Sequence, residues 1–86
     1  MTSEPDVKTA VSNLQTTIKE TDVDGEKESV LSDIEAHVDE LDHDSEDDLA
    51  TLKEKLQGAV LHFDAEHHSL VQSMQITINS LSNAGV

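Results

Sequence analysis

The sequence contains no cysteine and no arginine, and its 86 residues include one proline and a single aromatic residue, Phe63. Without cysteine the chain has no disulfide, no thiolate metal site and no cysteine nucleophile. One aromatic ring leaves no platform for stacking bases or sugars and no set of large anchors for a tight interface. These absences exclude several common classes of active and binding site.

Basic residues are scarce, because five lysines stand against nineteen aspartates and glutamates, for a formal net charge of −14 at pH 7. So negative a surface repels phosphate backbones and anionic lipid headgroups, and we expect neither nucleic acid nor a membrane as a direct partner. No apolar run reaches eight residues, so we expect no signal peptide, no membrane span and a cytoplasmic protein. The acidity fits either an interaction surface or a saline cytoplasm.

Four amphipathic segments fill the chain. In each of them aliphatic residues recur at spacings of three and four, which is the pattern of one narrow apolar stripe on a helix. We therefore expect helices over residues 4–21, 26–42, 45–65 and 68–82. The stripes are Val7, Val11, Leu14 and Ile18; Leu31, Ile34, Val38 and Leu41; Leu49, Leu52, Leu56, Ala59 with Val60, and Phe63; and Leu70 or Val71, Met74, Ile78 and Leu81.

Residues with strong preferences for helix ends separate these segments. Ser3 and Pro5 fit the start of the first helix, and Gly25 fits the turn that follows it. Ser45, followed directly by three acidic residues, matches the N-cap of the third helix. The run Asn83-Ala84-Gly85 is a typical helix stop.

The junction between the third and fourth segments has two interpretations. The apolar stripe loses register at Glu66 and His67, which favours a break around residues 65–68. An unbroken helix from Ser45 to Ser82 is the alternative, because no proline or glycine stands at the junction. Gly58, inside the third stripe, predicts a close approach of a neighbouring helix.

The expected fold is all-α: one domain, residues 1–86, that forms an antiparallel up-and-down bundle of three to four helices with coiled-coil-like seams. Short connections favour this topology. A chain of this size buries only about 60% of its unfolded surface. We therefore predict a homodimer, in which two copies share a core if the last stripe finds no cover within one chain.

Two stretches of the second half carry a family resemblance. Ala59-Val60 is followed by Phe63-Asp64-Ala65-Glu66-His67 within residues 56–70, and Leu81-Ser82 precedes Gly85-Val86 within residues 78–86. These features resemble a family of small bacterial proteins, domain of unknown function 4404. The resemblance implies one helical domain and no assigned activity. At His68 the family tends to have proline, which implies the first turn of a new helix.

Histidines and carboxylates are the candidate metal ligands, because imidazole and carboxylate groups bind Zn²⁺, Ni²⁺ or Cu²⁺. The densest cluster is Asp64, Glu66, His67 and His68. Its structural alternative is capping at the helix junction, which we favour, and we expect no bound metal or other cofactor. Helical spacing also pairs four histidines with carboxylates: Asp33 with His37, Asp39 with His43, His62 with Glu66, and Asp64 with His68.

Acidic runs give no specific cation site. Residues 22–26 superficially match a calcium loop, but the glycine comes too early and the twelfth position is Asp33, so we interpret them as a turn. Residues 39–48 hold seven carboxylates. Such a run is typical of a solvated face followed by helix-start acids, and we expect only weak, nonspecific cation binding.

For function, the sequence favours a non-enzyme, because a narrow-seamed bundle of this size has little interior in which to bury catalytic groups. The leading hypothesis is a self-associating acidic helical scaffold that binds a basic protein partner. The alternatives are a divalent-cation-binding or buffering protein, and an acidic inhibitor that mimics nucleic acid.

Overall fold

A computed structural model describes residues 6–63 and 67–86 of the chain. Within these residues the protein forms four α-helices: α1 (Val7–Glu20), α2 (Glu26–Asp39), α3 (Glu46–Val60) and α4 (His68–Asn83). The all-α prediction is confirmed. Because α3 and α4 are separate helices, the predicted break is confirmed and the alternative of one helix from Ser45 to Ser82 is wrong.

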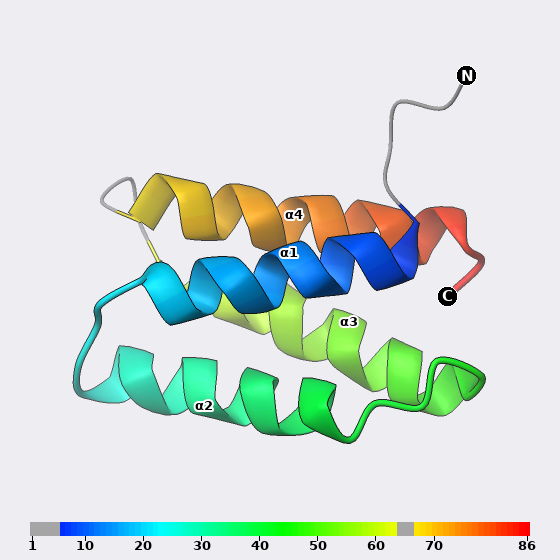
Figure 1. Cartoon of the computed structure of the whole chain (residues 1–86), viewed down its shortest axis with the longest axis horizontal. Helices are drawn as coiled ribbons and strands as arrows, with labels where there is room; N and C mark the ends of the chain where they lie inside the picture. Colours follow the sequence, from blue (N-terminus) through cyan, green and yellow to red (C-terminus); the bar gives the residue numbers. More distant parts are fainter. Residues whose placement is uncertain (1–5, 64–66) are drawn as a thin grey trace.

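Successive helices run in opposite directions (Figure 1). Each helix packs against two others, in the order α1, α2, α3, α4 and back to α1. One side of the bundle is therefore made by α1 and α4 and the other by α2 and α3, as Figure 1 shows from top to bottom. This is the predicted up-and-down bundle; the coiled-coil character of its seams stays a prediction.

The predicted stripes meet in one core. Its buried hydrophobic members are Val11, Leu14, Ile18, Leu31, Ile34, Val38, Leu49, Leu52, Leu56, Ala59, Phe63, Leu70, Met74 and Leu81. Three of the four residues of the last stripe find cover within the chain, since Leu70, Met74 and Leu81 are at most 1% exposed. The fourth, Ile78, is only half-buried.

Small side chains that belong to no predicted stripe are buried beside the core, and two of them, Ala10 and Thr77, lie where α1 meets α4. Ala10, Thr77 and Ser80 are buried. Thr77 Oγ1 lies 2.9 Å from the carbonyl oxygen of Ser73 in its own helix and 3.3 Å from that of Ala10 in α1. The close approach predicted at Gly58 is wrong, because a Cβ built there would meet nothing within 4 Å.

The first helix begins later than predicted. Asp6 has extended backbone and caps α1, with Oδ1 accepting the Thr9 N–H at 2.8 Å. The predicted start at Ser3 and Pro5 lies outside the described residues. Since Asp6 is the N-cap, the first helical residue of α1 is Val7.

Two other helices end earlier than predicted. Helix α2 stops at Asp39 rather than residue 42, because the Leu41 N–H bonds three residues back and the Asp42 N–H is taken by the Asp48 carboxylate. Helix α3 stops at Val60 rather than residue 65. The next amides also bond three residues back, and the chain turns so that Phe63 is buried at the end of the bundle.

Three predicted helix ends are confirmed. Gly25 precedes α2 with φ of 67°, a conformation that favours glycine. Ser45 Oγ accepts the Asp48 N–H at 3.3 Å and caps α3. Gly85 follows α4 with φ of 90°, while its own N–H and that of Val86 bond back to carbonyls of the last turn.

Candidate functional site

The predicted cluster at the α3–α4 junction is described only in part, because Asp64 and Glu66 lie outside the described residues. His67 occupies the N-cap position of α4 without a capping bond from its side chain. Its ring instead stands edge-on to Phe63, with centroids 5.4 Å apart. His68 is the first residue of α4, the position where proline is favoured. His67 therefore packs at the helix junction.

Asp22, His67 and His68 line one groove in the described part of the chain, but they form no metal site. Across residues 6–63 and 67–86, no group of three or more His, Cys, Asp or Glu could hold a metal ion. The predicted pair of Asp33 and His37 makes other contacts: Asp33 accepts from Lys55 Nζ at 2.7 Å, and His37 Nε2 lies 3.0 Å from the Asp48 carbonyl oxygen. Both side chains thus tie α2 to α3.

The acidic run between α2 and α3 is held by its own carboxylates. Asp48 accepts the Asp42 N–H at 3.1 Å, and Asp42 accepts the Asp44 N–H at 2.9 Å. At the start of α1 the N–H of Thr9 holds the pKa of the Asp6 carboxyl below its ordinary value. These three carboxylates therefore accept backbone N–H groups and stabilise the local chain conformation.

Charge divides the bundle into two halves. Fourteen of the nineteen carboxylates lie between Asp22 and Glu54, on α2, α3 and their connections. Helix α1 holds one carboxylate, Glu20, and residues 67–86 hold no Asp, Glu, Lys or Arg. The α2–α3 side is therefore acidic, and the α1–α4 side is polar with little charge. The uneven distribution of carboxylates along the chain is visible in the sequence. It becomes a difference between two faces only because α1 packs on α4.

A groove runs between the end of α1 and the start of α2, with a volume of about 320 Å³. Buried Ile18 and Leu31 belong to its lining. Three carboxylates from the loop and from one side of α2 also line it: Asp22, Glu28 and Glu35. The remaining lining residues are Thr21, Val23 and Ser32. This combination of apolar surface and carboxylates suits a long cationic side chain, whose stem is apolar and whose head is charged. We call it the acidic groove.

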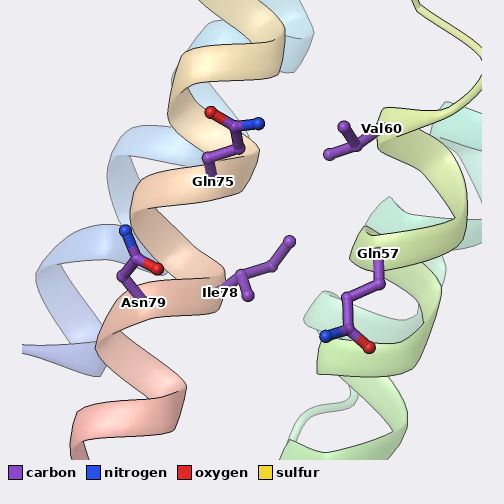
Figure 2. A pocket seen from close by; sticks show the side chains of 5 residues that line it. All are labelled: Gln57, Val60, Gln75, Ile78 and Asn79. Atoms are coloured by element: carbon purple, nitrogen blue, oxygen red, sulfur yellow. The ribbon is translucent and has the colours of Figure 1, made fainter.

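A second groove, of about 370 Å³, lies between α3 and α4. Figure 2 shows Val60 on α3 and Ile78 on α4 directed toward the space between the helices. Three amide side chains complete the lining: Gln57, Gln75 and Asn79. Among the described residues no charged side chain belongs to this lining, and we call it the amide groove. The sequence predicts neither groove, because the apolar stripes do not specify which side chains outside the core face each other across two neighbouring helices.

None of the helices within residues 6–63 and 67–86 combines the length and apolarity that crossing a membrane requires.

Residues 7–86 match the model of a protein family described as Domain of unknown function (DUF4404). The match confirms the resemblance seen in residues 56–70 and 78–86, and it extends over all four helices. Comparison with curated proteins and with solved structures gives no match.

Proposed function

We propose, from the premise that the chain belongs to the DUF4404 family, that it is a non-catalytic acidic helical protein that binds a basic protein partner. The acidic groove carries the proposal, because it joins three carboxylates to buried aliphatic residues. The proposal includes the predicted self-association and the cytoplasmic location. Family membership supplies no activity of its own.

Among the described residues, no lysine lines the acidic groove beside its carboxylates. None of the residues that line the acidic groove is basic. The lysines of the acidic half have other contacts: Lys27 Nζ lies 5.9 Å from the Phe63 ring centroid, Lys53 donates to the Val86 backbone oxygen and Lys55 pairs with Asp33. A cation from a partner would therefore find carboxylates that these lysines leave available.

A lysine or arginine side chain matches the groove in both of its parts. Its methylene stem can lie on half-buried Val23, beside Ile18 and Leu31, while its charged head reaches Glu28 or Glu35. The net charge of −14 attracts a basic partner from a distance and raises its association rate. Because this attraction is screened, binding is expected to weaken as salt rises.

The test compares two double variants that remove equal charge. Glu28→Gln with Glu35→Gln neutralises the acidic groove, whereas Glu40→Gln with Glu54→Gln neutralises two exposed carboxylates outside its lining. Fluorescence anisotropy of a labelled lysine-rich peptide gives the affinity of each full-length variant. We expect the groove variant to bind about tenfold more weakly, a change of about 1.4 kcal/mol, and the control to lose much less.

Two results would count against the proposal. Equal losses in both double variants would mean that net charge alone attracts the peptide, without a defined groove. A wild-type chain that shows no salt-sensitive binding would remove the basic partner altogether. The cation-binding and nucleic-acid-mimicking alternatives stay predictions.

A further inference from the structure

Helix α4 presents an uncharged face on a strongly acidic protein. It contains no Asp, Glu, Lys or Arg, although the chain as a whole carries a net charge of −14. Its exposed side chains include Gln72, Gln75 and Asn79, and Ile76 is 40% exposed. Depletion of charge is the compositional mark of the centre of a protein interface.

The amide groove lies along one edge of this face (Figure 2). Val60 and Ile78 are half-buried there, so both retain apolar surface that a partner can cover. Leu61, the residue after Val60, is 86% exposed. Apolar surface and amides therefore occur together, and the described part of the groove lining contains no charged side chain.

The amide lining fits a second copy of this chain, and charge decides which face that copy can meet. Two chains of charge −14 repel each other, and contact through the α2–α3 side would bring carboxylates against carboxylates. Contact through α4 avoids that cost. A two-fold interface must also be self-complementary, because the same patch meets itself. Glutamine and asparagine satisfy this requirement, since each amide both donates and accepts hydrogen bonds, whereas a carboxylate only accepts.

We infer that the amide groove, with the outer face of α4, is the two-fold interface of a homodimer. The inference rests on the self-association included in the proposed function and assigns it to Gln57, Val60, Gln75, Ile78 and Asn79. It leaves the acidic groove, which is lined by the end of α1, the following loop and α2, open in both copies. A dimer built this way presents two acidic grooves to basic partners.

The test places one negative charge in the interface and the same charge outside it. Asn79→Asp adds a carboxylate to the amide groove, and Asn13→Asp adds one to the exposed face of α1. Sedimentation velocity over a range of concentrations gives the dimer dissociation constant of each full-length variant. We expect Asn79→Asp to raise it about tenfold or more, because like charges then meet across the two-fold axis, and Asn13→Asp to leave it nearly unchanged.

Circular dichroism verifies that both variants remain helical, and the lysine-rich peptide is titrated into each. Loss of the dimer with unchanged peptide binding supports the inference and separates it from the acidic groove. A wild-type chain that is monomeric at high micromolar concentration overturns the inference, whatever its peptide affinity. Equal weakening by Asn79→Asp and Asn13→Asp overturns it as well, because the interface would then lie elsewhere.

Discussion

At the scale of single residues, carboxylates in this protein have two kinds of environment. Asp6 and Asp48 accept backbone N–H groups, at the start of α1 and in the connection between α2 and α3. Glu28 and Glu35 line the acidic groove instead. The first kind stabilises local structure, and we assign the second to binding. Substitution of a carboxylate that accepts a backbone N–H should therefore lower folding stability. Substitution of a carboxylate in the acidic groove should lower the affinity for a basic partner.

Asp6 provides a pH-dependent test of the carboxylates that accept backbone N–H groups. Its folded pKa is lowered by the Thr9 N–H, so its stabilising effect is full above the unfolded pKa and is lost as pH falls through the folded value. Asp6→Asn keeps a capping oxygen but does not titrate. We expect wild type to melt above Asp6→Asn at neutral pH, with this advantage shrinking in acid. Thermal unfolding followed by circular dichroism measures the difference, and a pH-independent difference would contradict the capping role.

At the scale of helices, the apolar stripes predict the core because large aliphatic side chains must leave water. They do not predict which helices touch most closely. Ala10 and Thr77 belong to no predicted stripe, yet they lie where α1 meets α4. Gly58 had the sequence signal for close approach and faces open space. Small residues mark a close contact only when the partner helix is known.

The sequence also does not show which side chains of neighbouring helices face each other, and this explains why the candidate sites were not predicted. Asp33 and His37 share a face of α2 by spacing, but α3 supplies a nearer partner for each of them. The acidic groove and the amide groove each need side chains from two helices, or from a helix and a loop, which a one-dimensional pattern does not bring together. Helix ends were predicted best where glycine or serine acts locally, as at Gly25, Ser45 and Gly85.

Overpacking of the α1–α4 contact gives a prediction at this scale. Ala10→Leu inserts three carbons where Thr77 lies close, and we expect a loss of about 1–3 kcal/mol of unfolding free energy. Ala36→Leu makes the same change at an exposed position of α2 and should stay within about 0.5 kcal/mol. Urea unfolding measures both. Similar values for the two variants would show that α1 and α4 do not pack closely at Ala10.

At the scale of the whole molecule, the order of the helices turns a division of charge along the chain into two faces. Carboxylates concentrate on α2, α3 and their connections, while α1 and α4 pair on the other side. In the proposed function the acidic side attracts basic partners, and in the proposed dimer two like-charged copies meet through the side with little charge. Added salt should therefore act in opposite directions on the two interactions, because it screens attraction in one and repulsion in the other.

The most direct measurement is one salt series on the full-length chain, with the dimer dissociation constant from sedimentation and the lysine-rich peptide affinity from anisotropy in each buffer. The account predicts that rising salt strengthens the dimer and weakens peptide binding. If salt weakens both interactions, the copies associate through ion pairs rather than through an uncharged face, and the assignment of two electrostatically distinct faces is wrong.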